Sequence, residues 1–187
     1  MRGHIFRSVV LFSATSFLSN SIAVEREKSE LTQQAKVKIH AFSKELKRNL
    51  KQAIKSGGLE AGIEVCHEKA PQIAQEMSTD GWTISRTSLK ARNDSNHPKL
   101  WQKEVLLQFQ KQLVQGTSAK QLSVSQLDDS SFKLMKAIPT GELCLSCHGT
   151  KIPMSVKNKL HELYPNDKAV NFSLKDIRGA FVVEKQL

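Results

Sequence analysis

Two cysteines and a histidine stand together in the segment "ELCLSCHGTK", residues 142–151. Cys144 and Cys147 are separated by two residues, so one helical turn can bring both sulfurs to the two vinyl groups of a haem. The next residue, His148, then offers its imidazole to the iron from the same side. The spacing predicts covalent attachment of one haem c, with thioether bonds from both cysteines and His148 as an axial ligand of the iron.

Three other chemistries use cysteine pairs of this kind, and the sequence argues against each. A thioredoxin-type redox pair opens a long helix after a strand, commonly beside an aromatic residue, whereas Leu143 precedes this motif and Gly149 follows it. A structural zinc site needs a second pair of ligands at similar spacing, and the remaining Cys and His residues are scattered. A disulfide between residues this close in sequence would be strained. We therefore interpret the pair as a haem c attachment site.

The iron of such a haem has a second axial position, for which the sequence leaves several side chains open. Cys66 is the third and unpaired cysteine, and it lies on an apolar helical stripe with Ile63 and Ala70. An unpaired thiol is a liability in an oxidising compartment, and coordination to ferric iron would hold it as a thiolate. The alternative is an inert buried thiol, because free cysteine behaves as a small hydrophobe. The full set of candidates is Cys66, His67, His40, His97, His161 and Met154.

The N-terminus has the features of an export signal. Residues 1–23 combine a basic start at Arg2 and Arg7 with a short apolar run and a small-x-Ala site that ends at Ala23. The apolar run is shorter than the roughly 20 residues that a membrane-spanning helix needs. We therefore expect cleavage after Ala23 and release into the periplasm, with residues 24–187 forming a single domain.

The composition is that of a globular protein with a basic surface. The 187-residue chain is 39% hydrophobic and 25% charged, which argues against disorder. Its formal net charge is +10, or +8 once Arg2 and Arg7 leave with the signal peptide. A periplasmic protein meets little nucleic acid, so we expect no nucleic-acid partner. A basic face can still steer docking to an acidic partner or to anionic lipid.

The hydrophobic pattern predicts an α+β fold with a small antiparallel sheet. Apolar residues at steps of three and four predict one long amphipathic helix over 25–56, ended by Gly57 and Gly58. We expect this helix to pack on the core, with a dimer or partner surface as the alternative. The other expected helices cover 59–77, 98–115 and 155–163, the expected strands cover 82–89, 131–138 and 176–185, and residues 117–130 are expected to form a loop.

Four segments of the chain carry a resemblance to a known family: "GIEVCHEKAPQIA" (62–74), "GWTISRTSLKARNDSNHP" (81–98) with Trp101, "CLSCHG" (144–149) and "LYPNDKAVNFSLKDIRGAF" (163–181). In matching order, they resemble a family of exported haem c domains with a PAS-like fold, some of which stand alone while others form the sensor part of histidine kinases. The resemblance extends over about residues 35–185. It implies that Cys66 is the distal ligand of the iron, opposite His148. The chain departs from the family pattern where Asp94 replaces the more usual proline and where "AVNFSLKD" lacks the usual glycines; both departures concern loops.

The resemblance and the thiolate chemistry together predict a sensor or an electron carrier. A thiolate ligand lowers the reduction potential of the iron, and we expect its bond to weaken on reduction, opening a position for CO, NO or His67. That would suit a redox or gas sensor that signals to a separate protein. The alternative is a soluble low-potential electron-transfer cytochrome with a protein redox partner. The sequence offers no distal acid–base pair, so we do not expect an enzyme. The polar side chains expected around the haem are Arg86, Ser88, Arg92 and Asn93.

Overall fold

The computed structural model describes residues 15–187, with side-chain burial defined from residue 21 onward. Most of the expected signal peptide, residues 1–14, lies outside the described residues, so cleavage after Ala23 stays a prediction. Within the described part of the chain, no helix is both long enough and apolar enough to cross a membrane.

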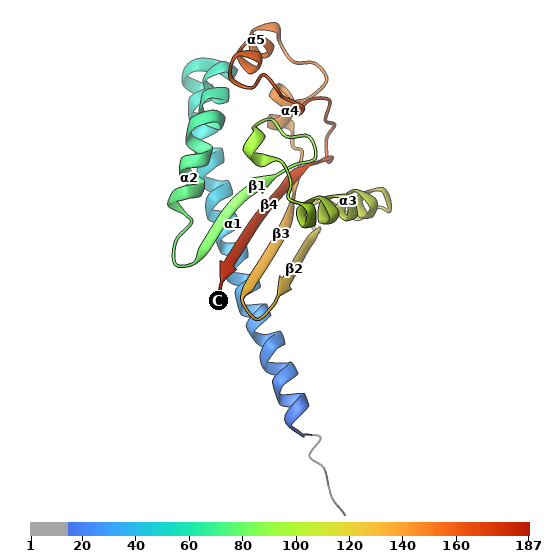
Figure 1. Cartoon of the computed structure of the whole chain (residues 1–187). Helices are drawn as coiled ribbons and strands as arrows, with labels where there is room; N and C mark the ends of the chain where they lie inside the picture. Colours follow the sequence, from blue (N-terminus) through green and yellow to red (C-terminus); the bar gives the residue numbers. More distant parts are fainter. Residues whose placement is uncertain (1–14) are drawn as a thin grey trace, which may run out of the picture.

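Four antiparallel strands form the centre of the fold, in the spatial order β1-β4-β3-β2 (Figure 1). Side chains alternate along β3, so that Phe132 and Leu134 pack on one face of the sheet while Met135 and Ala137 pack on the other. Both faces are therefore buried, and the predicted α+β class with a small antiparallel sheet is confirmed. The strands are β1 Trp82–Thr87, β2 Ser123–Leu127, β3 Ser131–Pro139 and β4 Ile177–Gln186.

Helices cover both faces of the sheet (Figure 1). The long helix α1 buries Leu31, Ile39 and Phe42 against one face, and α3 buries Leu106 and Phe109 against the other. The prediction that the long N-terminal helix packs on the core is confirmed, in a PAS-like arrangement. The helices are α1 Thr15–Glu64, the π-helical turn η1 Val65–Lys69, α2 Ala70–Glu76, the 3₁₀ turn η2 Asp94–Asn96, α3 Leu100–Val114, α4 Glu142–His148 and α5 Met154–Leu163.

The structure refines the sequence prediction in three places. Gly57 and Gly58 leave helical geometry, with Gly58 at φ +75°, yet the helix resumes at once and α1 continues to Glu64. The restart expected at Pro71 follows a π-helical turn that keeps the chain helical. Residues 123–127 were expected in a loop and instead form the edge strand β2. None of these five residues is buried, so the strand carries no hydrophobic signal.

A separate apolar cluster closes one end of the fold. Ile63 near the end of α1 packs with Val156 and Leu160 of α5 and with Tyr164, and Cys147 packs against this cluster. The helix that carries Cys147, α4, has no buried residue of its own. The position of the cysteine pair therefore depends on α5 and on the loops around it.

Candidate functional site

A cavity of about 1330 Å³ brings the chemically active side chains together. Its wall includes Cys66 from η1 and Cys144, Cys147 and His148 from α4. Small-molecule sites usually enclose roughly 300–1,000 Å³, so this space suits a group at least as large as a drug-sized ligand. Three sulfurs and one imidazole, predicted from two distant segments, thus line one space.

The short helix α4 sets the spacing of the cysteine pair. It begins after Gly141, whose carbonyl accepts a hydrogen bond of 3.0 Å from the N–H of Cys144. It ends at Gly149, where a Cβ would approach the carbonyl oxygen of Leu145 to 2.6 Å. A side chain at position 149 would therefore displace the last turn of the helix, which carries Cys147.

The imidazole of His148 is held in a defined orientation. Its Nδ1 donates a hydrogen bond of 2.7 Å to the carbonyl oxygen of Ala169, which leaves Nε2 with its lone pair. Burial, together with the positive charges of Arg178 and Arg92, holds the pKa of His148 well below its usual value. The side chain is a neutral imidazole at neutral pH, which is the form that binds a metal.

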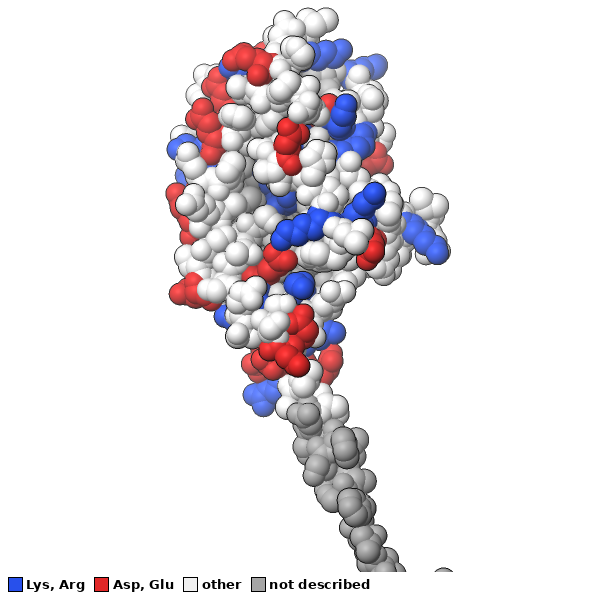
Figure 2. All heavy atoms as spheres, viewed as in Figure 1, with Lys and Arg blue, Asp and Glu red and all other residues white. Residues whose placement is uncertain are grey.

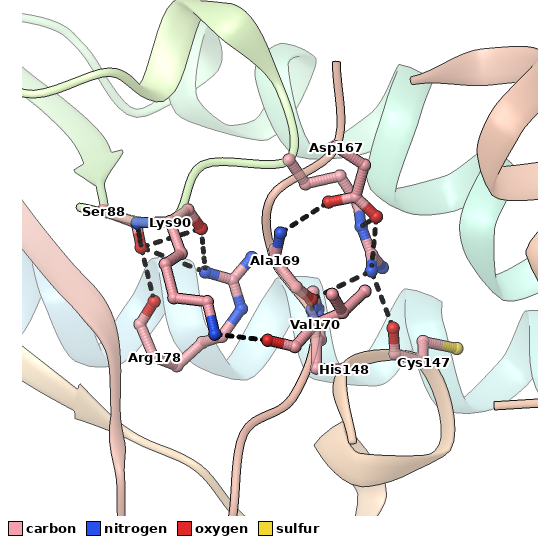
Figure 3. A network of polar contacts seen from close by, with 9 residues as sticks. Ser88, Lys90, Cys147, His148, Asp167, Ala169, Val170 and Arg178 are labelled. Atoms are coloured by element: carbon pink, nitrogen blue, oxygen red, sulfur yellow. Dashed lines mark hydrogen bonds and ion pairs between the residues drawn. The ribbon is translucent and has the colours of Figure 1, made fainter. Parts of the chain in front are cut away.

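An ion pair, which we call the Arg92–Asp167 clamp, fixes the backbone around His148 (Figure 3). The Arg92 guanidinium bonds the Asp167 carboxylate at 3.0 Å, the carbonyl of Cys147 at 2.6 Å and the carbonyl of Ala169 at 3.2 Å. Asp167 in turn accepts the N–H of Ala169 at 2.7 Å. The two side chains are 9% and 11% exposed, so the clamp is nearly buried. It ties the end of α4 to the carbonyl that orients His148.

Cys66 lies in the π-helical turn η1, on the same cavity wall. Its thiol is unpaired, and burial raises its pKa, while the nearby guanidinium of Arg86 acts in the opposite direction. π-Turns inside helices occur often at functional sites. The arrangement offers a soft sulfur ligand whose charged form needs a positive partner in the cavity.

Two further guanidiniums enter the cavity with incomplete pairing. The Arg86 side chain makes no hydrogen bond or ion pair with any described residue, and its guanidinium carbon lies 5.7 Å from the ring centroid of Phe42. Arg178 donates to Ser88 Oγ at 3.3 Å, but its buried Nε has no partner among the described residues. Burial lowers the pKa of Arg178 to about 10. These two side chains suit an anionic group on the ligand, such as a carboxylate.

The four polar residues expected around the haem do not all lie at the cavity. Arg86, Ser88 and Arg92 line the cavity, although Arg92 is occupied by the clamp rather than free to meet a ligand. Asn93 is not among the described residues that line the cavity. Its carboxamide oxygen accepts bonds from the backbone and hydroxyl of Ser95, because it caps the turn η2.

Of the candidates for a second axial ligand, the cavity wall includes Cys66 and the exposed His40. His67 points elsewhere: it packs edge-on against Tyr164, and its buried Nδ1 has no partner among the described residues. Met154 is 68% exposed at the start of α5. His97 and His161 also lie outside the set of described residues that line the cavity.

Three contributors to the site were missed by sequence reasoning. Ala169 acts through its backbone carbonyl, which leaves no signal in the residue type. Asp167 and Arg178 lie in the segment 163–181 that carries the family resemblance, and for Arg178 the apolar strand residues that follow it are the signal that could have drawn attention to it.

Comparison with known proteins agrees with this architecture. The fold is α+β and PAS-like, with a long helix packed on a small antiparallel sheet. Residues 19–185 match the Tll0287-like family, and the chain belongs to that family. Among solved structures it is similar to the crystal structure of the cyanobacterial heme-protein Tll0287, with 22% sequence identity, a TM-score of 0.58, and coverage of 80% of this chain and 93% of that chain. At this identity the likeness establishes the fold alone. A comparison with curated proteins found no match.

Proposed function

We propose that the protein holds one haem c in the cavity, with thioether bonds from Cys144 and Cys147 and with His148 and Cys66 as axial ligands. The observation that carries the proposal is the presence of all four side chains on the wall of one cavity of about 1330 Å³. The description of the similar structure as a heme-protein supports it. A bound haem would supply a redox-active iron. The partly unpaired Arg86 and Arg178 offer partners for its carboxylates.

Different residues of the chain would bind the haem, orient its ligands and fix the surrounding backbone. Ala169 orients His148 by accepting its Nδ1–H, as backbone carbonyls do for imidazoles that bind a metal through the other ring nitrogen. The clamp holds Ala169 in place, and the α4 turn presents both cysteines at one spacing. Cys66 supplies a sulfur from the other segment, on a π-turn whose geometry differs from that of the helices on either side.

The role that fits this arrangement best is a redox- or gas-sensing module of the periplasm, without enzymatic activity. Cys66 lies on the π-helical turn η1, which joins α1 to α2 and contacts both. Displacement of its sulfur by a small ligand would therefore change the position of both helices. An electron carrier is the second candidate, and the observation that favours it is the presence of five exposed lysines on the cavity wall.

Spectra of purified variants test the ligand set. With cytochrome c maturation factors co-expressed, wild type and Cys66→Ala should both keep haem on a denaturing gel, whereas Cys144→Ala/Cys147→Ala should lose it. Cys66→Ala should lose the thiolate signature of the ferric spectrum, and the matched variant His40→Ala should retain it. An unchanged ferric spectrum in Cys66→Ala would remove Cys66 from the ligand set. CO binding to the reduced wild type favours the sensor, and a reduced state that ignores CO favours the carrier.

A further inference from the structure

Six lysines line the cavity, and five of them are exposed. Leu143 and Leu174, 40% and 49% exposed, stand on the same wall, and Glu142 is its single acidic side chain among the described residues. On the face of the molecule seen in Figure 2, acidic and basic side chains occur side by side. These six lysines, which we call the lysine rim, are the exposed Lys36, Lys47, Lys51, Lys120 and Lys175 and the half-buried Lys136.

The lysine rim is assembled from four separate parts of the fold. Its members come from α1, from the loop after α3, from β3 and from the loop before β4. None of them forms an ion pair with a described carboxylate. Like charges gathered at one opening repel one another, and a cleft lined by one sign of charge focuses its field outward. The rim is therefore suited to attract an anionic surface.

We propose that the lysine rim is the docking surface for an acidic protein. Leu143 and Leu174 add exposed apolar surface to the same cavity wall, and protein interfaces usually combine an apolar part with a polar surround. An anionic membrane is the weaker fit, because surface-binding elements are amphipathic helices with aromatic residues on the apolar side, and the rim is made of lysines around an opening. The proposal rests on the second candidate function, the electron carrier, only in taking the partner to be a redox protein.

A binding measurement on the full chain tests the proposal. The probe is a flavodoxin, used as an acidic redox protein of defined charge, and the readouts are dissociation constants at several salt concentrations and amide shifts in NMR spectra. The charge reversal Lys47→Glu/Lys51→Glu alters the rim on α1. The matched control Lys103→Glu/Lys111→Glu makes the same change of net charge on α3, outside the cavity wall.

Binding should weaken steeply as the salt concentration rises, and the amide shifts should lie around the lysine rim. At low salt the rim variant should bind the flavodoxin at least about tenfold more weakly than wild type, and the control variant should bind within about twofold of wild type. Equal losses in both variants, or shifts on α3, would overturn it. Binding to phosphatidylglycerol vesicles but not to the flavodoxin would overturn it in favour of a membrane. None of these readouts requires haem, so a failure of haem attachment is recorded separately, by the gel above. If the rim variant fails to fold, the proposal is judged from the amide shifts of the wild type and from the salt dependence of its dissociation constant.

Discussion

The Arg92–Asp167 clamp joins the loop after β1, the end of α4 and the segment before β4 at one point. Its guanidinium has two carbonyls and one carboxylate as partners, and both side chains are nearly buried. A fully buried charge that loses its partner is costly, whereas an exposed pair contributes little. The clamp therefore has a consequence for stability as well as for the orientation of His148.

Arg92→Gln is expected to lower the free energy of unfolding by about 3 kcal/mol or more, because it leaves the Asp167 carboxylate unpaired in a nearly buried position. The measurement is urea unfolding of the purified protein. Adding Asp167→Asn should recover part of the loss, as coupled residues do in a double-mutant cycle. The matched control is Arg48→Gln, which breaks the exposed pair with Glu45 and should cost less than about 1 kcal/mol. Equal losses in Arg92→Gln and Arg48→Gln would contradict this account.

The β2–β3 hairpin depends on one aspartate at its turn. Asp128 accepts the N–H groups of Ser130 and Ser131 at 3.0 Å and 2.8 Å, and both hydroxyls as well. The backbone bond from Ser130, followed by the two hydroxyls, lowers the pKa of Asp128 to about 2. The edge strand β2 has no buried residue, so this turn is a principal determinant of its register. Sequence patterns miss such a strand, although the turn residues themselves are typical.

The pH dependence of the hairpin follows from the lowered pKa. A carboxyl whose folded pKa lies below its unfolded value of about 3.9 stabilises the fold above that value, and the contribution is lost as the pH falls through the folded pKa of about 2. Asp128→Asn should therefore lower the urea midpoint at pH 6, and the gap from wild type should shrink between about pH 4 and pH 2. Asp129→Asn, which removes none of these hydrogen bonds, should match wild type throughout. A gap that stays constant down to pH 2 would refute the role of the charge.

For the whole molecule, the sequence predicted which sulfurs and which imidazole come together at the cavity better than it predicted the residues that hold them there. The spacing of Cys144, Cys147 and His148 is local, so it could be seen without a fold, and the apolar stripe placed Cys66 on an inward helix face. The partners of His148 could not be predicted, because Ala169 acts through its backbone and reaches His148 only after the chain returns beside α4. The sequence predicted a basic face, but it could not predict that lysines from α1, the loop after α3, β3 and the loop before β4 line the same cavity.

The two ends of the fold differ in how strongly their buried apolar contacts stabilise them. The sheet is covered on both faces by large apolar clusters, whereas α4 has no buried residue and α5 has two, Val156 and Leu160. Segments with few buried contacts open locally at low free energy. A group bound covalently to Cys144 and Cys147 would also contact the opposite cavity wall. Those contacts exist only in the folded state, so they would stabilise it.

Hydrogen exchange of the haem-loaded chain and of Cys144→Ala/Cys147→Ala tests this difference between the two ends. In the variant without attached haem, residues 142–172 should exchange much faster than in the loaded chain, because α4 and α5 then rely on their own sparse contacts. Strands β3 and β4 should exchange at similar rates in both, because their protection comes from the sheet and its two clusters. Uniformly faster exchange, β3 and β4 included, would mean that the fold opens as one unit and that the cavity end has no separate stability.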